Sequence, residues 1–242
     1  MKRRFTLVLI ILVVAITATT VNQAFRPSNS IRTKGQKNAD KTVWPITDYV
    51  VTLPTDDPAK REKRNARNKR YNKSHFRVHP DDPGENTTLV DAADQKQPAL
   101  PLYPSVVVLI GSVNEAQAFL SEDRTGVYSE FNISVERILK RSDQGSMLRS
   151  VVEVERQGGR VKFASGKVHW YSVDKENMPL VGKRYVFFLD GDVNGDLQIL
   201  TAYQLENGKV IPLDELPQFR LFDGKDEAEF LNTLQTAVSN SK

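Results

Sequence analysis

The chain of 242 residues contains no cysteine. This absence excludes a disulfide framework, a thiolate metal site, a thiol nucleophile and a lipid-modified N-terminal cysteine. The common catalytic patterns are missing as well, since the sequence has no G-x-S-x-G, no H-E-x-x-H and no phosphate-binding glycine loop. We therefore favour a non-enzymatic protein, although the lack of these motifs does not by itself exclude an enzyme.

The composition, with 39% hydrophobic and 26% charged residues, is that of a foldable chain. It excludes disorder throughout, collagen and a polytopic membrane protein. The net charge of +4 hides an asymmetry, because residues 1–100 carry 18 Lys and Arg against 10 Asp and Glu. Residues 101–242 carry 16 against 20 and are therefore acidic. The positive charge belongs to the N-terminal part alone and does not support nucleic-acid binding by the whole chain.

Residues 1–24 have the pattern of a signal peptide or an N-terminal membrane anchor. Lys2, Arg3 and Arg4 precede ten uninterrupted apolar residues at 7–16, which is the arrangement of a secretory signal. This run is shorter than the roughly 20 residues of a spanning helix, but small residues at both −3 and −1 of a cleavage site are hard to find. In either case we expect export, to the periplasm or the extracellular space or as a single-pass anchored protein with its C-terminal domain outside the cytoplasm.

Residues 25–104 are polar and basic and lack a sustained period of 2 or 3.6, which predicts a mostly disordered linker. Asp57 and Pro58 could start a helix here, but the segment has no apolar stripe to dock it. A run of cations in this segment has two interpretations. It is either a polyanion-binding arm or a solvated charged segment. Cytoplasmic nucleic acid is out of reach for an exported arm. The candidate residues are Lys60, Arg61, Lys63, Arg64, Arg67, Lys69, Arg70 and Lys73.

Residues 105–242 show short segments of period 2 separated by Gly, Asp and Asn, which predicts an antiparallel sheet or a small barrel. Phe131, Ile133 and Val135 alternate with polar residues in the clearest of these strands. Gln157, Gly158 and Gly159 predict the turn of a hairpin between strands at 152–155 and 161–163. At 225–238 the period changes to that of an amphipathic helix.

The order of residues 127–140 (VYSEFNISVERILK), a Gly-Gly turn and residues 182–189 (GKRYVFFL) resembles the OB-like barrels of uncharacterised exported bacterial proteins. The resemblance covers roughly residues 106–213 and consists of strand patterns rather than catalytic motifs. It implies a mainly β fold, a small antiparallel OB-like barrel with a C-terminal helix, and an extracytoplasmic location. It assigns no site residues.

The sharpest local motif lies at residues 190–197, with Asp190, Asp192, Asn194 and Asp196 as oxygen donors at positions 1, 3, 5 and 7 and Gly195 at position 6. This spacing begins like a calcium loop, and Ca2+ is the one cofactor that the sequence suggests. Position 12 is Thr201 rather than Glu, and no helix precedes Asp190. The alternative is a hairpin loop that uses Asp, Asn and Gly as turn formers.

Trp170 and Tyr171 mark the expected ligand contact, because exposed aromatic rings make contact area at low entropic cost. From these observations we expect a non-enzymatic, exported or membrane-tethered module that binds a protein, peptide or glycan of the cell envelope. Two alternatives remain open. One is an envelope hydrolase with carboxylate or metal-assisted chemistry at Asp190, Asp192 and Asp196, and the other is polyanion binding through the basic run.

Overall fold

The computed structural model describes residues 41–50, 57–79, 87–89, 97–142, 150–191 and 195–241. The predicted signal or anchor, residues 1–24, lies outside these ranges, as do Asp192 and Asn194 of the predicted calcium loop. None of the helices in the described ranges is both long and apolar enough to cross a membrane.

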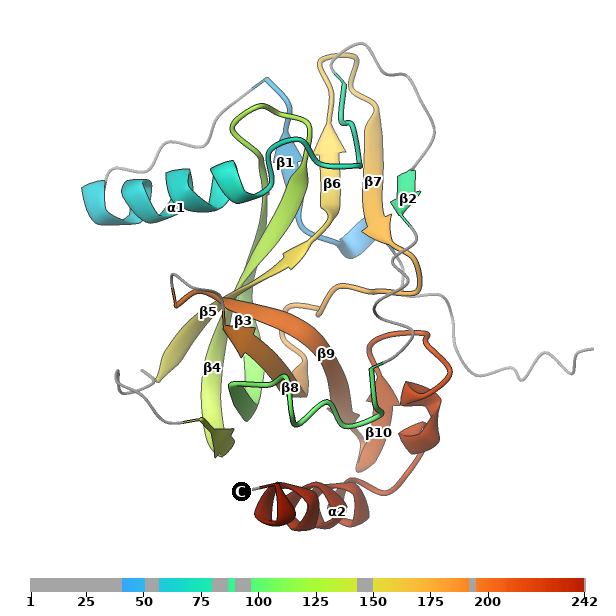
Figure 1. Ribbon diagram of the computed structural model, residues 1–242. Helices are drawn as coiled ribbons and strands as arrows, with labels where there is room; N and C mark the ends of the chain where they lie inside the picture. The colour runs from blue at the N-terminus through green and yellow to red at the C-terminus, as the bar shows by residue number, and fades with distance from the viewer. Residues whose placement is uncertain are drawn as a thin grey trace, which may run out of the picture. The chain divides into compact units, whose positions relative to one another are not determined.

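Strands dominate the described part of the chain (Figure 1), which confirms the prediction of a mainly β fold with a C-terminal helix. The helical elements are η1 (Lys41–Val43), α1 (Pro58–Arg70), η3 (Phe219–Phe222) and α2 (Glu227–Asn240). The strands are β1 (Ile46–Asp48), β2 (Thr87–Leu89), β3 (Val107–Leu120), β4 (Val127–Arg141), β5 (Val151–Gln157), β6 (Gly159–Lys162), β7 (Val168–Val173), β8 (Arg184–Gly191), β9 (Leu197–Glu206) and β10 (Lys209–Pro212).

The larger sheet has six strands in the order β10-β9-β5-β4-β3-β8, and β8 also pairs with β9. Its longest pairing is antiparallel between β3 and β4, with Val113 opposite Ile133, and its one parallel pairing joins β5 to β9. Alternate residues such as Leu109, Phe131 and Phe187 form a fully buried cluster on one face. The predicted period of 2 therefore marks the dry face of β4 correctly, since Phe131 and Ile133 belong to this cluster.

The other face of β3 and β8 is buried as well, because α2 covers it. Asp226 caps α2 by accepting hydrogen bonds from the backbone amides of Ala228 at 3.0 Å and Glu229 at 3.3 Å. The apolar stripe of the helix packs with η3 and the sheet (Figure 1), in a cluster that includes Val108, Ile110, Val186, Phe188, Tyr203, Phe219, Phe230, Leu234 and Val238. A strand buried on both faces reads as a continuous apolar run, as residues 185–189 do.

The smaller sheet has four strands in the order β1-β6-β7-β2. Strands β6 and β7 form an antiparallel hairpin whose turn contains Gly166 at φ +80°. The short strands β1 and β2 add to the two edges in parallel, so that segments preceding residue 90 complete a sheet formed by residues after 158.

The predicted hairpin at Gly158 and Gly159 is wrong, because β5 and β6 do not pair with each other. Strand β5 belongs to the larger sheet and β6 to the smaller one. The two glycines form the corner between the sheets, at φ +108° and +144°. A Cβ atom on Gly158 would lie 2.7 Å from the Tyr171 carbonyl oxygen, so the corner requires both the conformational freedom and the small size of glycine.

Residues 41–50 and 57–79 are ordered, although we expected them within a disordered linker. Helix α1 follows Asp57, whose carboxylate accepts a hydrogen bond from the Ala59 amide at 2.9 Å. The segment after α1 buries Phe76 and Val78 in a cluster with β6 and β7. The expectation fails because apolar anchors follow the basic run and because ion pairs to the larger sheet dock the helix itself.

Candidate functional site

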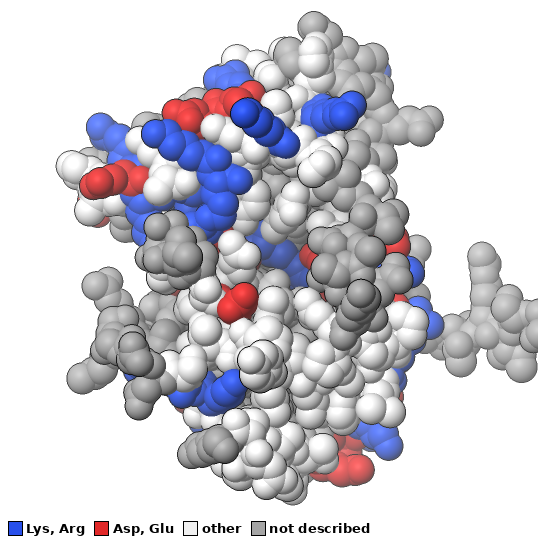
Figure 2. Space-filling view, viewed as in Figure 1, with Lys and Arg blue, Asp and Glu red and all other residues white. Residues whose placement is uncertain are grey.

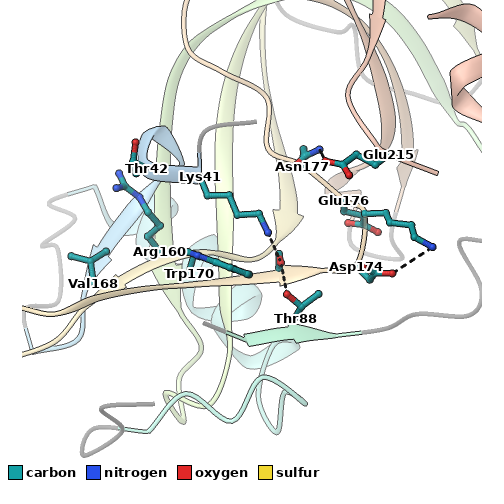
Figure 3. A pocket seen from close by; sticks show the side chains of 12 residues that line it. Lys41, Thr42, Thr88, Arg160, Val168, Trp170, Asp174, Glu176, Asn177 and Glu215 are labelled. Carbon is teal, nitrogen blue, oxygen red and sulfur yellow. Dashed lines mark hydrogen bonds and ion pairs between the residues drawn. The ribbon is translucent and has the colours of Figure 1, made fainter. Parts of the chain in front are cut away.

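A cleft of about 710 Å³ lies beside β7 of the smaller sheet. Its walls come from η1, β2, β6, β7 and the turn after β7, and Glu215 closes one side (Figure 3). The segments that line the cleft are far apart in the sequence, and the hydrogen-bonded smaller sheet brings them together. Such a rigid support is what a binding site needs to hold its side chains in place.

The indole ring of Trp170 forms a wall of this cleft and is partly exposed. The Lys41 ammonium lies 3.6 Å from the centroid of the ring and 5.1 Å from that of the buried Trp44. Lys41 Nζ also donates a hydrogen bond to Ser172 Oγ at 3.3 Å, and Ser172 Oγ lies 3.3 Å from the Thr88 hydroxyl (Figure 3). The ammonium therefore sits against the π face of one ring with hydroxyl groups beside it.

Charged groups of both signs line the same cleft as the indole. The carboxylates are those of Asp174, Glu176 and Glu215, and the cations are Lys41, Arg160 and Lys175. Several are held by structural partners. The Asp174 carboxylate lies 3.6 Å from Lys175 Nζ, and Glu176 accepts a hydrogen bond at 3.0 Å from Arg156. Glu176 is held by the buried Arg156, whereas Asp174 and Lys175 form an exposed pair.

The electrostatics of Lys41 reflect its position between solvent and the rings. Burial lowers the pKa of the Lys41 ammonium, and the negative charges of Glu215 and Asp174 offset this effect only in part. The cation thus loses more hydration than its surroundings replace.

The structure separates the two aromatic residues that the sequence analysis grouped together. Trp170 lies at the cleft, whereas Tyr171 is only 2% exposed and packs edge-to-face on Phe76, with 5.7 Å between ring centroids. Neighbouring residues of a strand point to opposite faces, so only one of the two could reach the cleft. Tyr171 belongs to the core.

The basic run forms α1, and three of its arginines face the larger sheet. Arg67 is only 1% exposed and lies on carboxylates from three places in the chain. Its guanidinium nitrogens are 3.0 Å from Glu130 on β4, 3.5 Å from Glu155 on β5 and 2.7 Å from Asp196. Arg67 is therefore inaccessible to an external polyanion. We call the four cations of α1 and the four carboxylates that pair with them the α1 cluster. Its members are Lys63, Arg64, Arg67, Arg70, Glu130, Glu153, Glu155 and Asp196.

Basic side chains, among them Arg61 and Lys69, remain exposed on α1. Figure 2 shows Lys and Arg side chains gathered over this helix. One face of α1 therefore docks on carboxylates and the other meets solvent. Only the solvent-facing cations remain candidates for polyanion binding. Lys60 belongs to the same helix, but the placement of its side chain lies outside the described structure. Lys73 follows α1 at φ +56°, and its backbone amide donates to Asp123 at 2.7 Å.

Burial and ion pairing compete within the α1 cluster. Burial alone would raise the pKa of Asp196, but hydrogen bonds from Arg67 and Arg70 and the nearby positive charges lower it to about 2. At Glu155, which is fully buried, desolvation outweighs the attraction of Arg70 and Arg67 and raises the pKa. A lowered and a raised pKa make opposite contributions to the pH dependence of stability. The effect of Asp196 therefore has to be tested by substituting that residue alone.

We expect Asp196→Asn to flatten the acid dependence of stability. The pKa of Asp196 in the folded state, about 2, is below its ordinary 3.8, so ionised Asp196 stabilises the fold above pH 4. This contribution is lost as the pH falls from about 4 to 2. Melting followed by circular dichroism from pH 7 to 2 should show a smaller fall in Tm for the variant than for the wild type. Asp223→Asn, at an exposed position outside the cluster, should retain the wild-type dependence. Equal losses for Asp196→Asn and wild type would contradict the assignment.

The calcium prediction concerns a loop that the structure describes only at its ends. Asp190 Oδ1 accepts a hydrogen bond from the Gly191 amide at 2.8 Å, and Asp196 is only 4% exposed and bound to Arg67 and Arg70. In the described ranges, no group of three or more Asp, Glu or His side chains is arranged to hold a metal ion. The carboxylate of Asp196 serves the α1 cluster, which leaves it poorly suited to metal binding or hydrolysis.

Lys41 and Glu215 were missed by the sequence analysis, and no local motif marks either. Lys41 and Ser172 are 131 positions apart in the sequence. Comparison of the chain with protein-family models, with curated proteins and with solved structures found no match. Inference of function therefore rests on the geometry of the cleft and of the α1 cluster.

Proposed function

We propose that this protein is an exported, non-enzymatic binding module whose ligand occupies the cleft beside Trp170. The observation that carries the proposal is a partly exposed indole in a cleft of about 710 Å³, which is also lined by carboxylates, cations and hydroxyl groups from η1, β2, β6, β7 and the segments that follow β7 and β10. A ring of this kind supplies contact area, and the fixed polar groups around it supply specificity. An envelope peptide, protein or glycan offers the apolar and polar groups to match.

The strand pairings support an OB-like barrel as the scaffold. Pairing proceeds from β3 to β4, β5, β9 and β8 and from β8 back to β3, and the β5–β9 pair is parallel. We infer that these five strands form the small barrel that the sequence resemblance implies. OB domains bind ligands on the face of their second and third strands, here β4 and β5. Helix α1 covers charged residues of that face, Glu130, Glu153 and Glu155, which favours the cleft on the smaller sheet as the ligand site.

The proposed location follows from the N-terminal sequence. The cations of residues 2–4 and the apolar run at 7–16 would hold the N-terminus at the membrane or direct its cleavage. In both cases the cleft would face the cell envelope. Fractionation of tagged full-length protein, with N-terminal sequencing, tests this point, and recovery of the intact chain in the cytosol would refute it.

Trp170→Ala should weaken ligand binding at least tenfold, because truncating a central aromatic contact removes about 2 kcal/mol or more and a tenfold change needs only about 1.4 kcal/mol. Full-length protein labelled with 15N is titrated with N-acetylglucosamine oligosaccharides and with short peptides that carry charged side chains. The indole resonance of Trp170 reports binding in the wild type, and backbone resonances of β7 report it in the variant.

Leu221→Ala is the matched control, since Leu221 is an exposed apolar residue that does not line the cleft. It should bind as the wild type does. The proposal fails if neither class of probe shifts the β7 resonances at millimolar concentration, or if Trp170→Ala binds as tightly as the wild type.

A further inference from the structure

The face of the Trp170 ring is occupied by a cation of the protein itself. The Lys41 ammonium lies 3.6 Å from the ring centroid and reaches it from η1, a three-residue turn that precedes β1. One hydrogen bond, to Ser172 Oγ at 3.3 Å, accompanies this contact. A single long side chain on a short turn can leave the ring by rotating about its own bonds, without unfolding a strand.

The surroundings of the ring favour a cation once Lys41 has left. Among the lining residues, the carboxylates of Asp174, Glu176 and Glu215 then outnumber the cations Arg160 and Lys175 by one, and Glu176 is in addition paired with Arg156. Glu215 and Asp174 already act on the Lys41 ammonium through their charges. Ser172 Oγ lies 3.3 Å from the ammonium and Thr88 Oγ1 lies 3.3 Å from Ser172 Oγ, and both hydroxyl groups can accept hydrogen bonds.

The kind of cation follows from the cost of desolvation. An ammonium is a compact, strongly hydrated point charge, and burial at this site lowers the pKa of Lys41 despite the two carboxylates. A guanidinium is more weakly hydrated, stacks flat on an aromatic face and has five N–H donors for carboxylate and hydroxyl oxygens. The cleft offers one ring face, two carboxylates that act on the resident charge and two hydroxyl groups.

We propose that the cleft binds the arginine side chain of a peptide, with the guanidinium stacked on Trp170 in the place that the Lys41 ammonium now occupies. This assignment rests on the proposed function, because it uses the same cleft. Lys41 acts as an internal competitor that the ligand displaces. Asp174 and Glu215 pair with the incoming cation, and Ser172 accepts from it.

The experiment titrates the full-length protein with three blocked tripeptides, acetyl-Ala-Arg-Ala-amide and its lysine and citrulline counterparts. Citrulline keeps the planar shape of arginine and lacks its charge. We expect the arginine peptide to shift the Trp170 indole resonance and to bind at least about fivefold more tightly than the other two. Its affinity should fall as salt is added, since a charge–charge contribution is screened.

Four variants complete the test. Lys41→Ala should bind the arginine peptide about fivefold more tightly, because the competing cation is gone, and Asp174→Asn and Glu215→Gln should each weaken binding by a similar factor. Lys167→Ala also removes a positive charge, but from the exposed turn between β6 and β7, and should leave affinity unchanged. Thermal melting of each variant separates effects on folding from effects on binding.

The outcomes are distinct. Equal binding of the arginine and citrulline peptides, or unchanged affinity in Lys41→Ala, would overturn the guanidinium assignment. Binding of an oligosaccharide or of a peptide without arginine at Trp170 would then leave the proposed function intact. If none of the probes shifts the Trp170 resonance, both proposals fall together.

Discussion

Arg67→Met is expected to destabilise the protein by about 3–5 kcal/mol, which is the usual cost of removing one partner from a buried ion pair. The Arg67 guanidinium contacts Glu130, Glu153, Glu155 and Asp196, and without it these carboxylates keep only the more exposed cations of α1. Methionine fills a similar volume and cannot neutralise their charge. Equilibrium unfolding in urea measures the change.

Two matched variants show whether the loss comes from the ion pairs. Lys69→Met removes a cation from the exposed side of the same helix and should change the free energy of unfolding by less than about 0.5 kcal/mol. Arg67→Lys keeps the charge but offers a single ammonium to several carboxylates, and should fall between the two. If Arg67→Met is within about 1 kcal/mol of wild type, the α1 cluster does not stabilise the docked helix.

Gly158→Ala should cost about 2–6 kcal/mol, as the sum of backbone strain and steric overlap. Gly158 has φ +108°, and an added Cβ would lie 2.7 Å from the Tyr171 carbonyl oxygen and 2.8 Å from the Met178 methyl group. The carbonyl belongs to the backbone of β7 and cannot move alone. The substitution should therefore also displace β7 and weaken binding in the Trp170 cleft.

Gly166→Ala is the control for this variant. Gly166 also has a positive φ, of +80°, but nothing lies within 4 Å of its added Cβ. Its expected cost is about 1 kcal/mol, from conformation alone. Equal stability of the two variants in urea would show that close approach at the corner between the sheets is unimportant.

The fate of the charged residues could not be read from the sequence. Glu153 and Glu155 alternate with Val152 and Val154 on β5, and this pattern indicates a dry face and a polar face. This polar face is only partly solvated, because Glu155 is fully buried under α1 whereas the Glu153 side chain remains 34% exposed. One signal was present, namely arginines spaced three apart at 64, 67 and 70, which place three cations along one side of a helix.

The candidate site was predicted in part. Trp170 follows from its type and from its place in a strand, whereas its contact with Lys41 joins positions 129 residues apart. Tyr171 was wrongly grouped with Trp170, because the sequence alone does not show which face of β7 is buried against the rest of the protein. Its burial is decided by Phe76, which comes from a segment that we expected to be unstructured.

The sequence by itself determined the mainly β fold, the location of most strands after residue 105 and the C-terminal helix, because hydrophobic period is a local property that each segment carries alone. The tertiary structure decided which groups meet. It brings Arg67 to its carboxylates and Lys41 to Trp170, and it pairs β6 with β1 rather than with β5. These pairings depend on contacts between distant segments. Charge and size allow many partners for each residue, and only the packing of the two sheets and α1 selects among them.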